Sequence, residues 1–242
     1  MKQSLAIGFL CLASMSTPAA DVGAGRSRSL ACQACHGSTG VGTAPDIPNL
    51  AAQKEGYLQA QLVAFRSKGR KHELMNAIAE QLSDTDIENL AAFWSSLPAG
   101  DAHGAADPAA EFRKSRMTFP AEFPQDFVMY HEELGEDKKI AKRSYANRAV
   151  VKAARSGKDL PLGSAIVVEN IANEQVVSYA AMESRAGWGD GIPEILRNGD
   201  WTYALFDGKR TLNAGFNYAR CLACHKPVAA SSYVFGLEAI RK

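Results

Sequence analysis

Two short stretches of this chain each place two cysteines one helical turn apart, with a histidine directly after the second. They occupy residues 32–36 (CQACH) and 221–225 (CLACH). Thiols at this spacing can add to the two vinyl groups of one heme, and the adjacent histidine can then bind the iron. The spacing predicts two covalently bound heme c groups, with attachment at four cysteines and proximal ligation by two histidines: Cys32, Cys35, Cys221, Cys224, His36 and His225.

Other uses of a CxxC pair explain less of this pattern. A thioredoxin-like pair needs a preceding strand and gives the repeated histidine no role. A zinc site would need both pairs together, and they lie near opposite ends of the chain in unlike surroundings. A structural disulfide also leaves the histidines unexplained, so heme attachment is the favoured interpretation.

Composition sets the broader class. The chain has 242 residues, 46% of them hydrophobic, and a formal net charge of +1. These are ordinary values for a folded protein with room for two small domains. The near-neutral charge excludes a polycation that would bind nucleic acid and an acidic disordered tail.

Residues 1–20 have the three-part pattern of a secretory signal. Lys2 precedes an apolar run from Leu5 to Ala13, and small residues follow as far as Ala20. The run is too short to span a bilayer, and no later segment is long enough, so we expect no membrane span and a periplasmic protein. The odd fifth cysteine, Cys11, should leave with the signal, and the other four should be consumed as thioethers.

A heme iron with one histidine has a second axial position, and Met75 is our prediction for it in the first domain. It is the only methionine between residues 21 and 98, and it lies in a segment (HELMNAIAEQLSD) that we expect to be a loop. A thioether ligand favours reduced iron and raises the potential. His72 is the rival ligand, and core packing is the ordinary alternative for a methionine.

The end of this first domain predicts a helix. Ser83 is a suitable N-cap with Asp86 three residues later, apolar residues follow at helical spacing, and Pro98 ends the run. With CQACHG, IPNLAAQ and the Met75 segment, residues 21–98 resemble the class I cytochrome c family in its small bacterial c4/c5-like or c553-like form. The resemblance implies an all-α fold around a His/Met heme, with Pro48 supporting His36 and Gly25 packed against Phe93 or Trp94.

A basic run precedes Met75, formed by Arg66, Lys68, Arg70 and Lys71. Such a run is usually a solvated face. Near an exposed heme edge it could instead steer an acidic redox partner protein, an effect that salt would weaken. Both interpretations stay open.

Residues 99–118 begin with small, polar residues and read as a linker, in which we expect His103 to face solvent. From residue 119 the sequence pattern changes to short runs rich in β-branched residues (SAIVVENI, VVSYAAME). A predicted strand, WTYALFD, then enters an Asp207-Gly208 turn. NRAVVKAARSG predicts a short helix ended by Gly157. We expect residues 119–242 to be an α+β domain, mainly antiparallel β.

The order of segments in this second domain, from YAN through GDWTYALFDGKR to CLACHKP and SSYVFG, resembles the cytochrome P-460 family, which includes the cytochromes c′-beta. The resemblance implies a five-coordinate heme with His225 proximal and an open distal side. In cytochrome P-460 a lysine is cross-linked to the heme, and Val168 aligns with it here, which favours a plain heme c. Glu183 and Arg185 are the nearest polar candidates for a distal pocket, and Met129 and Met182 are further candidate sixth ligands for which core packing is the ordinary role.

These features predict a diheme cytochrome c whose first heme exchanges electrons with a second heme that binds or oxidises a small nitrogen-oxide ligand. Whether it is an enzyme stays open; if so, it would be an oxidoreductase acting on hydroxylamine or nitric oxide. The alternatives are a gas-binding protein without turnover and a pure electron-transfer protein. A peroxidase-like diheme enzyme does not match the β-rich second half.

Overall fold

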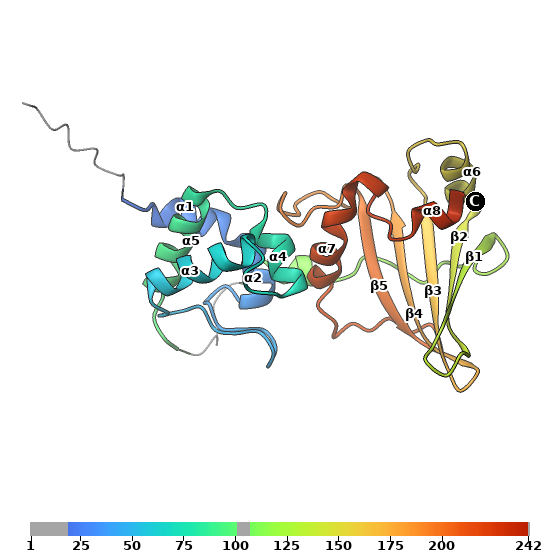
Figure 1. Cartoon of the computed structure of the whole chain (residues 1–242), viewed down its shortest axis with the longest axis horizontal. Helices are drawn as coiled ribbons and strands as arrows, with labels where there is room; N and C mark the ends of the chain where they lie inside the picture. Colours follow the sequence, from blue (N-terminus) through green and yellow to red (C-terminus); the bar gives the residue numbers. More distant parts are fainter. Residues whose placement is uncertain (1–18, 101–106, 242) are drawn as a thin grey trace, which may run out of the picture.

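The computed structural model describes residues 19–100 and 107–241. Cys11 and His103 lie outside the described residues. So does the predicted signal peptide, except for its last two residues. Figure 1 shows a helical N-terminal domain followed by a C-terminal domain built on one sheet. Both fold classes agree with the prediction. Within the described part of the chain, no helix is both long enough and apolar enough to cross a membrane.

The N-terminal domain consists of short helices held against the last and longest of them: α1 (Val22–Arg28), α2 (Leu30–His36), α3 (Glu55–Arg66), α4 (Glu73–Ala79) and α5 (Asp84–Ser96). The predicted N-cap of α5 is confirmed as a capping box, in which Ser83 and Asp86 satisfy each other's backbone N–H groups. The buried face of α5, which includes Leu90 and Trp94, packs against α1 and α3.

Close approach of α1 and α5 depends on Gly25. A Cβ at this position would lie 2.0 Å from the Asn89 carbonyl oxygen and 2.9 Å from Phe93 Cβ. This confirms the expected packing of Gly25 against an aromatic residue of the last helix, namely Phe93.

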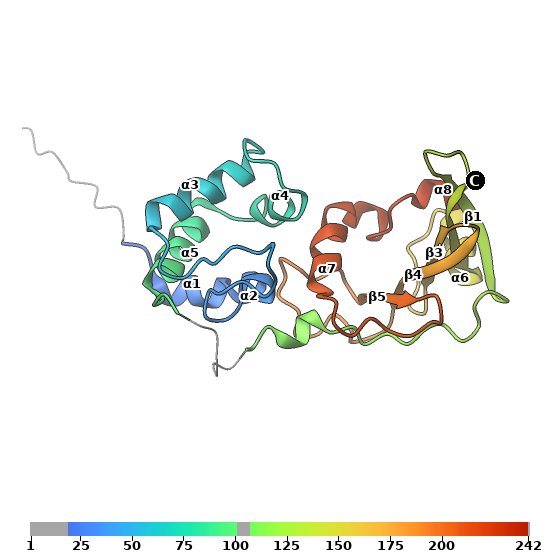
Figure 2. The same cartoon turned by 90° about the horizontal axis from the view of Figure 1, so that it is seen from below.

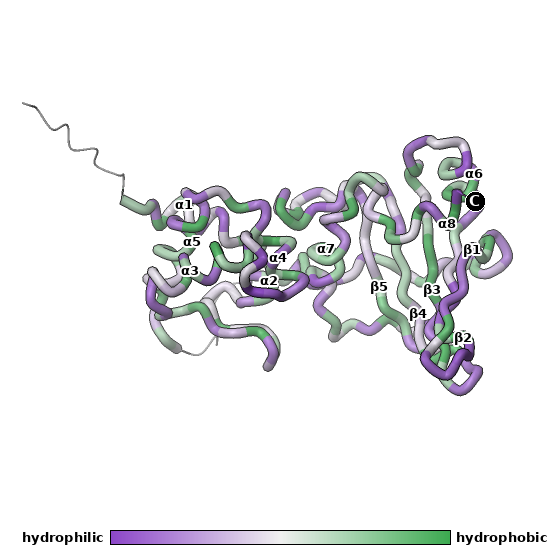
Figure 3. The backbone as a smooth tube through the Cα atoms, in the orientation of Figure 1, coloured by the Kyte–Doolittle hydropathy of each residue, from purple (hydrophilic) through white to green (hydrophobic). Residues whose placement is uncertain are grey.

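The C-terminal domain is an antiparallel sheet in chain order, with strands β1 (Phe127–Leu134), β2 (Ile140–Asn147), β3 (Ala165–Ala172), β4 (Gln175–Ser184) and β5 (Trp201–Asp207). The β3–β4 turn is a two-residue loop in which Asn173 and Glu174 both have positive φ, the geometry that matches the twist of a hairpin. In Figure 3, β3 is hydrophobic along much of its length, whereas the turns at the far end of the sheet are hydrophilic.

The two faces of the sheet are covered differently. One face, which includes Ile166, Met182 and Tyr203, joins the apolar cluster under the helices α6 (Arg148–Arg155), α7 (Ala219–His225) and α8 (Leu237–Arg241). The other face packs aromatic rings edge to face, with the Arg210 guanidinium 4.6 Å from the Phe119 ring centroid. The strand β5 contributes to both clusters, with Trp201 and Tyr203 in the first and Ala204 and Phe206 in the second.

A short 3-10 helix, η1 (Ala110–Arg113), lies within the segment expected to be a linker. It contacts α2, and Phe112 packs against buried apolar residues. Seen from below, η1 lies between α2 and the C-terminal domain (Figure 2). A second 3-10 helix, η2 (Lys226–Ser231), continues directly from α7.

We predict that Gly25→Ala destabilises the protein by about 1–3 kcal/mol, because the added methyl group must push α1 away from the α5 backbone. Gly56→Ala in α3 is the matched control, since its Cβ would meet nothing within 4 Å. This control should be neutral or stabilising by up to about 1 kcal/mol. Thermal unfolding followed by circular dichroism compares them, and equal melting temperatures would contradict the packing argument.

Candidate heme-binding sites

The first CxxCH motif forms the helix α2, so Cys32 and Cys35 lie one turn apart and His36 occupies the last position. His36 is buried, and its Nδ1 lies 2.8 Å from the Pro48 carbonyl oxygen. A carbonyl can only accept, so Nδ1 is the donor and Nε2 keeps its lone pair. Burial also lowers the pKa of His36, which favours the neutral ring that an iron ligand requires.

The second motif forms α7 and repeats this arrangement in a different fold. His225 Nδ1 lies 2.7 Å from the Tyr233 carbonyl oxygen, and burial lowers the pKa of this histidine as well. Its ring packs between two aromatic rings, with centroid distances of 4.4 Å to Tyr203 and 4.8 Å to Phe235. The ring is therefore fixed in orientation, again with Nε2 as the free nitrogen.

All four motif cysteines are unpaired. Burial raises the pKa of the Cys32 thiol and of the Cys221 thiol to about 12 in each case. A redox-active CxxC pair needs the opposite shift, because its thiolate is the reactive form. Nor do the motifs combine into a zinc site: the described residues hold no group of three or more His, Cys, Asp or Glu suited to a metal ion. The donor set fits heme c.

The predicted axial ligand Met75 lies on the short helix α4, so the expectation of a loop was wrong. The reason is a local cap: Nδ1 of His72 accepts the Met75 backbone N–H at 3.3 Å, and Asn76 Oδ1 accepts the His72 N–H at 2.8 Å. Met75 is half-buried, whereas His72 is exposed and engaged in capping. This engagement favours Met75 over its rival.

The candidate residues of the second domain separate between the two faces of the sheet. Val168 lies on the face of Ile166 and Met182, the face on which Tyr203 meets His225. Glu183 points to the opposite face, where its carboxylate pairs with Arg185 at 2.7 Å. Met182 is buried in the core, as expected.

Met129 is 46% exposed, so the expectation that it packs in the core was wrong. It lies on β1 just before an irregularity in the pairing with β2.

A cavity of about 350 Å³ adjoins α7. Its lining includes Leu222, between the two cysteines of the second motif, and Tyr203, which packs against His225. The rest of the lining is both apolar and charged, and includes Phe112, Trp188, Glu111, Lys114, Arg116 and Asp190.

The basic run before Met75 has intramolecular partners for three of its four members. Arg66 pairs with Asp84 at 2.5 Å and Lys68 with Glu80 at 2.6 Å. Arg70 donates to Gln61. This pairing favours the solvated-face interpretation over partner steering.

Comparison with known proteins finds two families. The Cytochrome P460 family model matches residues 120–236. The model described as cytochrome C oxidase, cbb3-type, subunit III, matches residues 18–93.

Among curated proteins, the chain is 43% identical over 81 residues to cytochrome c-554(548) of Halomonas halodenitrificans, covering 32% of this chain and 98% of that one. It is 38% identical over 109 residues to cytochrome c4 of Stutzerimonas stutzeri, covering 41% of this chain and 51% of the relative. The thiosulfate dehydrogenase electron acceptor of the same species is 37% identical over 97 residues, covering 37% of this chain and 45% of the relative. The chain thus spans about half the length of these last two proteins.

A solved cytochrome c4 of Acidithiobacillus ferrooxidans is 34% identical, covers 35% of this chain and 54% of that one, and superposes with a TM-score of 0.32.

Two domains that each carry a CxxCH helix with an oriented, neutral histidine define a c-type cytochrome. The chain belongs to this family, with a class I cytochrome c domain followed by a cytochrome P460 domain. It is an electron-transfer protein whose cofactors are two covalently bound heme c groups, and such a protein requires a redox partner.

Sequence reasoning missed the residues that hold the second motif in place. Asn198 is fully buried, and its Nδ2 donates to the Leu222 carbonyl at 3.0 Å and lies 2.8 Å from the Tyr203 hydroxyl. Nothing in the local pattern RNGDW distinguishes this asparagine from an ordinary turn residue.

We predict that Asn198→Ala costs about 1–3 kcal/mol, because it leaves the buried Leu222 carbonyl and Tyr203 hydroxyl without this partner. Absorbance of the second heme should change during thermal unfolding at a lower temperature than in the wild type. Asn213→Ala, at an exposed position, is the control and should melt as the wild type does. Identical melting of the two variants would contradict the role given to Asn198.

Proposed function

We propose that this protein is an exported, periplasmic diheme cytochrome c in which the two CxxCH motifs attach the hemes. Cys32 and Cys35 would hold the first heme and Cys221 and Cys224 the second, with one axial histidine from each motif. The observation that carries the assignment is the matched geometry at His36 and His225, where a backbone carbonyl engages Nδ1 in both domains.

Heme c, when bound, accepts and donates one electron at a time. The chain would contribute orientation and shielding. Pro48 and Tyr233 fix the histidine rings through their carbonyl oxygens, and an oriented Nδ1–H also makes Nε2 a better ligand. The buried setting of His36 would shield the first heme from water, and Met75 would be the second residue that holds this heme.

The second site would keep an open distal side and bind a small nitrogen-oxide ligand or oxidise it. Support comes from the P460 family match and from the apolar face that surrounds Val168. Because valine cannot form a cross-link to the heme, we expect an unmodified heme c spectrum. The pairing of Glu183 with Arg185 on the opposite face argues against a direct distal role for either.

A second candidate function is gas binding without turnover, which the valine favours. The fused electron-transfer domain favours turnover, because a tethered electron acceptor raises the effective concentration of oxidant at the second site. Steady-state oxidation of hydroxylamine or nitric oxide with an external electron acceptor separates these functions. A protein in which both hemes only carry electrons would show neither turnover nor gas binding.

We predict a pyridine hemochrome stoichiometry of two hemes per chain and a reaction of ferrous protein with carbon monoxide at only one of them. Met75→Ala should open the first heme, so that carbon monoxide changes both spectra, and should lower the first reduction potential. Met129→Ala, at an exposed position on β1, is the matched control and should behave as the wild type. Two gas-inert hemes would contradict the open second site, and an unchanged Met75 variant would contradict its ligation.

A further inference from the structure

The second cysteine of each motif contacts a residue of the other domain. Cys35 Sγ of α2 lies 3.8 Å from Asn217 Nδ2, which belongs to the segment leading into α7. Cys224 Sγ of α7 lies 3.6 Å from Glu73 Oε1, in the first turn of α4. The two heme-attachment sites therefore meet at one interface. In each site, the sulfur of the second cysteine makes the contact with the other domain.

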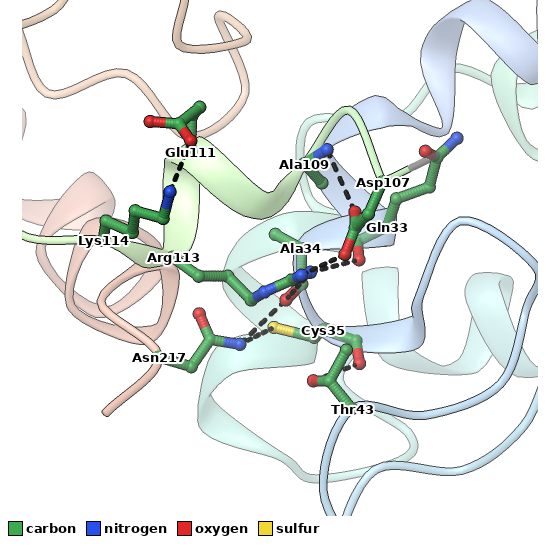
Figure 4. Close-up of polar contacts among 10 residues, drawn as sticks. All are labelled: Gln33, Ala34, Cys35, Thr43, Asp107, Ala109, Glu111, Arg113, Lys114 and Asn217. Carbon is green, nitrogen blue, oxygen red and sulfur yellow. Dashed lines mark hydrogen bonds and ion pairs between the residues drawn. The ribbon is translucent and has the colours of Figure 1, made fainter. Parts of the chain in front are cut away.

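The interface is built on the end of α2, where helix carbonyls lack partners within the helix. Asn217 Nδ2 donates to the Ala34 carbonyl at 2.8 Å. Arg113 of η1 donates to the carbonyls of Gln33 and Ala34 at 3.4 and 3.5 Å, and its guanidinium also pairs with Asp107 (Figure 4). A cation at this end also complements the helix dipole. Residues outside the first domain thus complete its heme-attachment helix.

Further contacts between the two domains hold α2 and α7 in this relative position. Arg220, in α7, pairs with Asp46 of the loop that follows the first motif, at 2.5 Å. Gln81 Nε2 donates to the Ile195 carbonyl at 3.1 Å. One apolar cluster also includes buried residues of both domains, among them Ala31 and Leu222. The domains are packed together as well as tethered.

We propose that electrons pass directly between the two hemes across the contact between α2 and α7, on the side where Cys35 and Cys224 lie. Asn217 is the residue that positions this contact. The inference rests on the proposed heme attachment. In each transfer one ferrous iron is oxidised and the other, ferric iron is reduced, and no bond or proton changes place.

Asn217 is well suited to this role because its contacts survive heme attachment. A thioether sulfur has no proton, so Cys224 can no longer donate to Glu73 once the heme is attached. The amide of Asn217, by contrast, still donates to the Ala34 carbonyl and can still approach the Cys35 sulfur, which is a weak acceptor. Its Oδ1 also accepts the Ala219 N–H at 3.2 Å, which links the contact to the start of α7.

The test is Asn217→Asp in the full diheme protein. Aspartate keeps an acceptor for the Ala219 N–H but presents an oxygen, rather than an N–H, to the Ala34 carbonyl. Asn213→Asp makes the same change of charge at an exposed position in the same loop. Pulse radiolysis adds one electron to oxidised protein, and the concentration-independent exchange of this electron between the two heme spectra gives the rate.

We expect Asn217→Asp to slow this exchange about tenfold, because it removes the hydrogen bond to the Ala34 carbonyl and sets a carboxylate against that oxygen, which weakens the contact between α2 and α7. A carboxylate beside Cys35 should also lower the potential of the first heme, so both potentials are measured in each variant and the exchange rates are compared at equal driving force. Equal exchange rates in the two variants would overturn the proposal, as would the absence of any concentration-independent exchange in the wild type.

Two prior measurements on each variant separate this failure from failure of the proposed function. Pyridine hemochrome must give two hemes, and the carbon monoxide reaction must match the wild type. A wild type with fewer than two hemes refutes the proposed attachment and this inference together. When two hemes are present, the exchange rate tests only the proposed electron route across the α2–α7 contact, because pulse radiolysis does not depend on gas binding.

Discussion

The hydrogen bond from a histidine Nδ1 to a backbone carbonyl is the constraint around which both domains are arranged. A CxxCH helix can present its histidine to iron only if the ring is neutral and held in one orientation. The first domain supplies the carbonyl of Pro48 from the loop after α2. The second supplies that of Tyr233 from a turn in which Ser232 and Tyr233 both have positive φ. Two unrelated backbones thus produce the same local geometry.

The surroundings of this hydrogen bond differ between the two domains. In the first domain, a small set of helices closes around His36, and the neighbouring α4 carries a methionine that can complete the coordination. In the second, a sheet and the rings of Tyr203 and Phe235 hold His225. The interface links the two sites, because Arg113 and Asn217 lie outside the first domain and donate hydrogen bonds to carbonyls at the end of α2.

Much of the fold was predictable because its signals are local. The capping box of Ser83 and the turn that follows β5 are each encoded within a few residues, whereas the close approach of Gly25 to α5 came from the family resemblance. The strands β1 and β2 were missed because they carry charges on both faces, among them Glu133 and Lys142, which pair across the hairpin at 3.0 Å. A turn centred on residues 135–138 was the available signal.

Some residues of the candidate sites could also be predicted from local sequence, and others could not. Spacing within residues 32–36 and 221–225 predicts heme attachment, whereas Asn198, Asn217 and Arg113 act on helices far away in the sequence. Their side chains are ordinary in local context, and only the packed structure places them on the carbonyls of α2 and α7. The helix that carries Met75 was missed because its N-cap is a histidine, which is a less common cap than serine or aspartate.

The central claim is that the two attachment helices, α2 and α7, meet at a single packed interface and would hold their hemes close together. Electron paramagnetic resonance of the fully oxidised protein tests this most directly, since two ferric irons held close together interact magnetically. We predict a spectrum with broadened, coupled signals, which simplifies when one heme is reduced. A fully oxidised spectrum equal to the sum of two independent ferric hemes would contradict the account.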